Sequence, residues 1–130
     1  MSVTAPGSFS IRSSQERGIA RLQPIGELDI TTAPILKRAF EAALDDHQGS
    51  ERIVVDLTEV SFMDSTGIHL LLQMNAACRG TGRLRVVNGS QAVVRVLDVS
   101  GVREVLPIIS SDQDPLQPLS SPWTRAAQQA

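Results

Sequence analysis

One apolar run, followed by a polar turn and a helical pattern, constrains the fold of this chain most. Ile53, Val54 and Val55 are consecutive apolar residues, as in a strand that is buried on both faces. After a short loop, Asp64-Ser65-Thr66-Gly67 opens a segment whose apolar residues recur at helical spacing. Asp, Ser and Thr side chains cap helix starts. The sequence therefore predicts a hydroxyl-bearing turn at a helix N-terminus, where free N–H groups and the helix dipole favour an anion.

The segments before this run predict a hairpin. Phe9 and Ile11 alternate with polar residues, and 19–25 is mostly apolar, so two antiparallel strands are expected. Pro24 cannot donate a ladder hydrogen bond, so the second strand should end there or lie at an edge. Residues 26–29 are expected to form a loop.

A helix should follow that loop. Thr31 or Thr32 can cap it, Pro34 fits its first turn, and it should stop within 45–49. Its apolar stripe consists of Ile35, Leu36, Ala39, Phe40, Ala43 and Leu44.

The segments after the polar turn predict two more helices and two more strands. The core side of the helix that opens at 64–67 is marked by Ile68, Leu71, Leu72 and Ala76, and Gly80 and Gly82 should end it. A short strand is expected at 83–87, a third helix capped by Ser90, and a last strand around Val105-Leu106. Alternating strands and helices after a hairpin favour an α/β fold in which the helix-linked strands are parallel.

Composition bounds the size of the domain and the class of protein. We expect one domain over 8–109 and a flexible Ser/Pro/Gln-rich C-terminal tail over 110–130, where Trp123 is an isolated aromatic residue. The formal net charge of −2 argues against direct nucleic-acid or anionic-membrane binding, and no apolar run is long enough to span a bilayer. The single cysteine, Cys78, excludes an internal disulfide and fits a reducing cytosol. Neither His47 nor Cys78 has metal-ligand spacing, so no metal site is expected.

The central stretch also resembles a known family. Val54-Val55-Asp56-Leu57, followed by Phe62-Met63-Asp64-Ser65-Thr66-Gly67, is similar to the signature of STAS domains of the bacterial anti-sigma factor antagonist family. The resemblance extends over most of 9–109. It implies a single STAS-like α/β domain, with a mixed β-sheet flanked by α-helices. In that family the Ser directly after the Asp is phosphorylated by a partner kinase, and this position corresponds to Ser65.

The resemblance implies a function in transcription regulation. The chain would bind a cognate anti-sigma factor, usually a serine-protein kinase, and thereby free a sigma factor in the bacterial cytoplasm. Phosphorylation at Ser65 would switch the antagonist off, and a phosphoserine phosphatase would restore it. ATP belongs to the kinase, so the chain would need no cofactor and would not be an enzyme.

The predicted partner-binding residues lie around the phosphoacceptor. They are Asp29, Asp64, Ser65, Thr66, Gly67 and His69. Asp64 and Ser65 have a simpler interpretation as helix caps, and Asp29 as a residue that closes a turn. Thr66 is the second candidate phosphoacceptor. His69 departs from the family, where a small or polar residue usually stands, so it leaves open which kinase is recognised.

Two rival functions remain. One is a non-switching STAS interaction module in a signalling or lipid-transport assembly, against which the intact motif at 64–67 argues. The other is an enzyme with Ser65 as nucleophile. The chain has two histidines without a recognisable Ser-His-Asp arrangement, and it lacks the G-x-S-x-G elbow.

Overall fold

A seven-stranded mixed sheet with helices packed against it forms the domain in the computed structural model, which describes residues 2–4, 9–45, 52–78 and 83–116. The strands are β1 (Ser2–Thr4), β2 (Ser10–Glu16), β3 (Ile19–Leu28), β4 (Arg52–Asp56), β5 (Val60–Met63), β6 (Leu84–Val87) and β7 (Ile108–Ile109). The helices are α1 (Ala33–Leu44), α2 (Ser65–Ala77) and α3 (Gln91–Val99), with a 3₁₀ turn, η1 (Val102–Glu104). The predicted α/β class and mixed sheet are confirmed.

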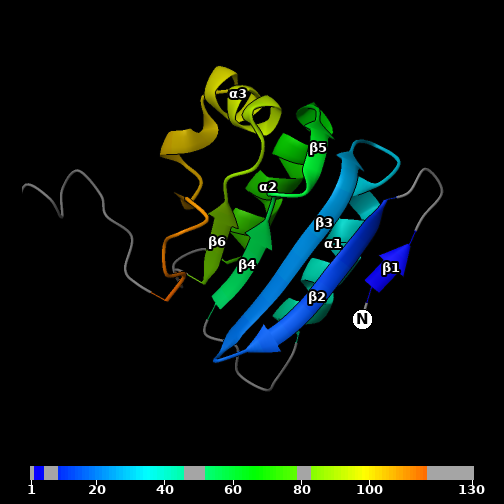
Figure 1. Cartoon of the computed structure of the whole chain (residues 1–130), viewed down its shortest axis with the longest axis vertical. Helices are drawn as coiled ribbons and strands as arrows, with labels where there is room; N and C mark the ends of the chain where they lie inside the picture. The colour runs from blue at the N-terminus through cyan, green and yellow to red at the C-terminus, as the bar shows by residue number, and fades with distance from the viewer. Residues whose placement is uncertain (1, 5–8, 46–51, 79–82, 117–130) are drawn as a thin grey trace, which may run out of the picture.

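The strand order is β1-β2-β3-β4-β6-β7, with β5 placed beside β3 (Figure 1). β2 pairs antiparallel with β1 on one side and with β3 on the other, whereas β4, β6 and β7 follow β3 in parallel. Helices α1 and α2 lie behind the sheet in Figure 1, and α3 lies at the end of the sheet where β5 is.

The central strand is buried as its apolar run predicts. Ile53 and Val55 join the core beneath the helices, together with Leu36 of α1 and Leu71 of α2. Val54 points to the other face and is also fully buried, beside Val87, Ile109 and Ile19. A strand that is covered on both faces needs an unbroken apolar run, which explains the Ile-Val-Val sequence.

The expectation for Pro24 is wrong, because β3 continues through it to Leu28 and is an interior strand. Pro24 stands where β3 changes partner, since Leu22 is the last residue paired with β4 and Gly26 is the first paired with β5. The N–H of Gly26 points to that side and donates to Glu59 O. Alternate residues of a strand direct their N–H groups to the same side, so the missing N–H of Pro24 falls in the gap.

The segment 26–29 is also not the expected loop, because Gly26–Leu28 pair with a strand that the sequence pattern did not reveal. β5 returns to the same edge of β3 that β4 uses, farther along that edge. It has only four residues, with a buried residue at each end and two exposed residues between them. Such a pattern resembles neither an alternating strand nor a fully apolar one.

Two predictions near the ends of elements are corrected. The last strand is β7, not a strand around Val105-Leu106: Val105 is 60% exposed after η1, and Leu106 packs in the core. In α2, Ala76 is exposed, whereas Leu70 and Met74 are buried. The buried side of this helix is therefore wider than a single stripe, because both the sheet and α1 lie against it.

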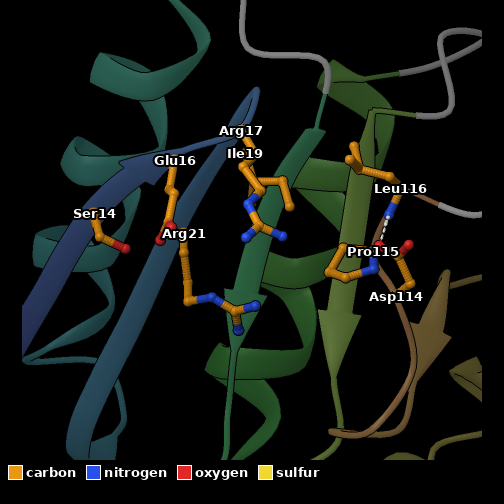
Figure 2. Close-up of a pocket in the computed structure, with 8 residues that line it drawn as sticks. All are labelled: Ser14, Glu16, Arg17, Ile19, Arg21, Asp114, Pro115 and Leu116. Atoms are coloured by element: carbon orange, nitrogen blue, oxygen red, sulfur yellow. Dashed lines mark hydrogen bonds between the residues drawn. The ribbon is translucent and has the colours of Figure 1, made fainter.

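The first residues of the predicted tail fold back over the sheet. Residues 110–116 form turns, and Asp114 accepts a hydrogen bond from the Leu116 N–H at 2.9 Å. Figure 2 shows Pro115 and Leu116 across the groove from Ile19 at the start of β3. Both residues are half-buried. A domain that ends at 109 stays a prediction.

Some expectations fall on residues outside the described ranges. These are the tail beyond 116 with Trp123, the helix stops at Gly80 and Gly82, and His47. Helix α2 itself ends at Ala77.

Candidate functional site

Two polar turns meet at one edge of the sheet. Asp29 follows β3 and Asp64 follows β5, and the carboxyl ends of parallel strands lie at the same edge. The Asp64 N–H donates to Leu28 O at 3.4 Å, which joins the two turns directly. The structure therefore brings the Asp29 turn beside the turn that carries Ser65.

The turn before α2 is capped by Asp64. Its side chain accepts a hydrogen bond from the Thr66 N–H at 2.9 Å, and its carbonyl accepts from the N–H groups of Gly67 and Ile68 at 3.1 and 3.3 Å. Ser65 is the first residue of the helix, and its side chain is exposed. None of the hydrogen bonds among the described residues involves its hydroxyl. The cap thus fixes the backbone of Ser65 and leaves the hydroxyl in solvent.

The same cap reduces the number of free N–H groups that could bind an anion at this helix start. Asp64 already binds Thr66 N, and the next two N–H groups are directed to its carbonyl. A phosphate on Ser65 would have to displace the Asp64 carboxylate to reach Thr66 N. The helix start therefore offers a phosphate on Ser65 fewer free N–H groups than an uncapped helix start would.

Gly67 is buried and has a packing role. A Cβ at this position would overlap Met63 Cγ and lie 2.8 Å from its Sδ and 3.2 Å from Leu28 Cδ2. The first turn of α2 can therefore approach β3 and β5 only because residue 67 has no side chain. Its predicted contact with a partner stays a prediction.

The Asp29 turn uses its own polar groups internally. Asp29 Oδ1 accepts from the N–H groups of Thr31 and Thr32 at 2.9 and 3.2 Å. The buried Thr32 hydroxyl accepts from Asp29 N at 2.9 Å and donates to Glu27 O at 2.7 Å. Thr32, rather than Thr31, precedes α1, although its hydroxyl binds backward and not to the helix. The turn-closing interpretation of Asp29 is confirmed, and its role in partner binding stays a prediction.

A largely apolar groove lies between α2 and α3 beside Ser65. It has a volume of about 530 Å³. Its lining residues include Ser65, His69, Leu72, Arg95, Val96 and Val99. His69 is exposed at the groove and lies one helical turn beyond Ser65.

Sequence reasoning missed several exposed residues near the two turns and at the groove. Ile30, beside Asp29, is 76% exposed, and Phe62, in β5, is 47% exposed. Val99 is 82% exposed and, with Arg95, belongs to α3. One signal was available for α3: Val93 and Leu97 form its buried stripe, and Val99 falls outside that stripe.

Two other chemistry-bearing residues of the described chain, Cys78 and Asp56, have structural surroundings. Burial raises the pKa of the Cys78 thiol, against a smaller opposite effect of Arg83, so the thiolate nucleophile is disfavoured. Asp56 closes β4 by binding Thr58 N at 3.0 Å and Arg21 at 3.1 Å. Within the ranges 2–4, 9–45, 52–78 and 83–116, no cluster of three or more His, Cys, Asp or Glu side chains could hold a metal ion. Nor is any helix in these ranges long and apolar enough to cross a membrane.

Comparisons with known proteins agree with this fold. The family model of the STAS domain matches residues 10–114. The anti-sigma F factor antagonist of Paenibacillus polymyxa is 28% identical over 113 residues, which cover 86% of this chain and 96% of that protein. A crystal structure of an anti-sigma factor antagonist from Mycobacterium paratuberculosis has a TM-score of 0.75 and 25% identity, and the match covers 88% of this chain and 96% of that one.

The phosphorylated form of the Bacillus cell fate determinant SpoIIAA has a TM-score of 0.57 at 19% identity, covering 92% and 99% of the two chains, and shows likeness of fold alone. The family model spans most of the sequence, from the hairpin through β7. The chain belongs to the STAS domain family.

Proposed function

We propose that this protein is an anti-sigma factor antagonist that binds an anti-sigma factor with serine kinase activity and frees a sigma factor. The observation that carries the proposal is the exposed Ser65 on a capped, rigid turn beside an apolar groove. Relatives over nearly the whole chain are named antagonists of anti-sigma factors. An antagonist acts by binding its target, so the proposed role needs no catalysis by this chain. Because sigma factors act in transcription, we place the protein in the cytoplasm.

The surface around Ser65 has the character of a protein interface. Ile30 and Phe62 are large apolar side chains exposed near the two joined turns, and Val99 is exposed at the groove. Exposed apolar side chains gathered within a polar surround are typical of protein interaction sites. We infer that the partner covers this surface and contacts the exposed Ser65 and His69, with Asp29 and Asp64 beside them.

Phosphorylation of Ser65 by the same partner would act as the off switch. A phosphate adds roughly −1.5 to −2 charges beside Asp64, on a surface that the partner must desolvate. A hundredfold loss of affinity needs only about 2.7 kcal/mol. The phosphorylated form of SpoIIAA supports the compatibility of this fold with such a modification. A phosphoserine phosphatase would reverse the switch.

Exposure favours Ser65 over Thr66 as the phosphoacceptor. Ser65 is exposed and its hydroxyl is outside the cap, whereas Thr66 is half-buried and its N–H is held by Asp64. A kinase must bring the hydroxyl into its own active site, so accessibility decides between two adjacent hydroxyls.

The test is phosphorylation and binding with candidate anti-sigma factor kinases. Wild type, Ser65→Ala and the matched control Thr66→Ala are incubated with kinase and ATP, and the site is mapped by mass spectrometry. We expect modification of wild type and Thr66→Ala but not of Ser65→Ala, and weaker kinase binding after modification. Equal modification of Ser65→Ala would move the acceptor to another residue. Equal binding of modified and unmodified protein would leave a non-switching STAS interaction module.

A further inference from the structure

We propose that Arg95 of α3 binds the phosphate once Ser65 is phosphorylated, so that the modification bridges α2 and α3 across the groove. This inference rests on the proposed phosphorylation of Ser65. It adds a cationic hydrogen-bond donor for the phosphate, within this chain but outside the motif at 64–67.

Position is the first observation. Arg95 lines the groove that Ser65 and His69 also line. It also lines the neighbouring hollow beside Phe62 and Met63 at the end of β5. The turn at Asp64 is preceded by Phe62 and Met63 and followed by Ser65. Arg95 therefore lines one hollow on each side of this turn.

The charges around Arg95 are the second observation. In the part of the chain that the structure describes, the Arg95 guanidinium forms no ion pair or hydrogen bond. Asp98, the acid nearest to it along α3, is held by Arg103 at 2.8 Å. The carboxylates of Asp64 and Asp29 accept backbone N–H groups of their own turns. The exposed Arg95 guanidinium therefore lies near the Ser65 turn and is not paired with a carboxylate of the described chain.

The chemistry of the two groups fits. A guanidinium presents paired donors that match the oxygens of a phosphate, and such charge-assisted bonds are stronger than neutral ones. His69, four residues after Ser65 on α2, is a further donor at the same groove. Since Asp64 occupies Thr66 N, the helix start supplies little of this binding. The phosphate would thus turn to the groove side, toward α3.

This bridge has a consequence for recognition. The groove lining beyond the charged residues is apolar and includes Leu72 and Val96. A phosphate held between α2 and α3 would lie over this lining, so modification would alter the shape of the surface as well as its charge. A carboxylate at position 65 has less charge and fewer acceptor oxygens than phosphate. Ser65→Asp should therefore imitate the modified state incompletely.

The experiment measures the second ionisation of phosphoserine 65 by ³¹P NMR. Phosphoserine is installed at position 65 during translation, so that no kinase is needed, in otherwise wild-type protein, in Arg95→Gln and in Lys37→Gln. Lys37 is an exposed residue of α1 outside the groove, so its loss matches the change in net charge. A bound cation favours the dianion, so the phosphate pKa in wild type should be about half a unit lower than in Arg95→Gln. Lys37→Gln should match wild type.

Salt dependence provides the second measurement. The difference between wild type and Arg95→Gln should shrink in high salt, as for an exposed ion pair. Unmodified wild type and both variants should melt at the same temperature, because both side chains are exposed. Identical phosphate pKa values in wild type and Arg95→Gln would overturn this inference and leave the proposed function standing. Failure of every kinase to modify Ser65 would count against the proposed function without changing this readout.

Discussion

The starts of α1 and α2 contain the same two kinds of side chain, an aspartate and a hydroxyl residue, but bury the hydroxyl in one case and expose it in the other. Each follows a strand that ends at the same edge of the sheet, and each combines an aspartate with a hydroxyl. Before α1, Asp29 closes a turn and the Thr32 hydroxyl is buried between Asp29 N and Glu27 O. Before α2, Asp64 caps the helix directly and the Ser65 hydroxyl is exposed.

The difference lies in where the aspartate stands relative to the helix. Asp29 is four residues before the first residue of α1, so the intervening turn folds the hydroxyl inward. Asp64 is immediately before α2, so the next side chain is already helical and points outward. An aspartate near a hydroxyl is therefore not by itself a modification site, because the spacing decides whether the hydroxyl is structural or available.

The largest effect should come from the tight contact beneath the α2 start. Gly67→Ala places a Cβ against Met63, and overpacking of this kind costs about 2–3 kcal/mol of unfolding free energy. This loss should outweigh the roughly 1 kcal/mol by which alanine favours a helix interior over glycine. Urea denaturation measures the change. An unchanged or higher midpoint would show that the α2 start can move away from β5 without cost.

The central comparison is tested by removing each hydroxyl. Thr32→Val keeps the shape but leaves Asp29 N and Glu27 O without their partner, so it should cost about 1–2 kcal/mol. Ser65→Ala should change stability by less than about 0.5 kcal/mol, because its exposed hydroxyl makes no bond within the described chain. Equal losses in the two variants would contradict the division into a structural and an available hydroxyl.

A smaller effect should come from the cap itself. Asp64→Ala removes the acceptor of the Thr66 N–H and should cost about 1 kcal/mol. Asp64→Asn keeps an oxygen at that place and should recover most of the loss. Thermal or urea unfolding of the three proteins checks this order. If the asparagine variant were as unstable as the alanine variant, the cap would depend on the charge of Asp64 and not on its hydrogen bond.

Much of this arrangement is determined locally and was therefore predictable from the sequence. The Ile53–Val55 run needs burial on both faces wherever the strand is placed. Asp64 and Ser90 cap their helices through atoms two or three residues away, so their roles depend on neighbours in the chain. The resemblance of 62–67 to the family motif also predicted Ser65 as the phosphoacceptor.

Tertiary structure alone decided the features that depend on distant segments. Strand β5 exists because β3 is longer than β4 and leaves part of its edge open, which four residues with no clear period do not reveal. The same gap accommodates Pro24, whose missing N–H would otherwise end an interior strand. Arg95 lines the same groove as Ser65, although it lies about thirty residues later in the chain, because α3 packs beside β5. Local pattern thus specified the elements and their caps, whereas pairing and packing between segments specified which surfaces they form together.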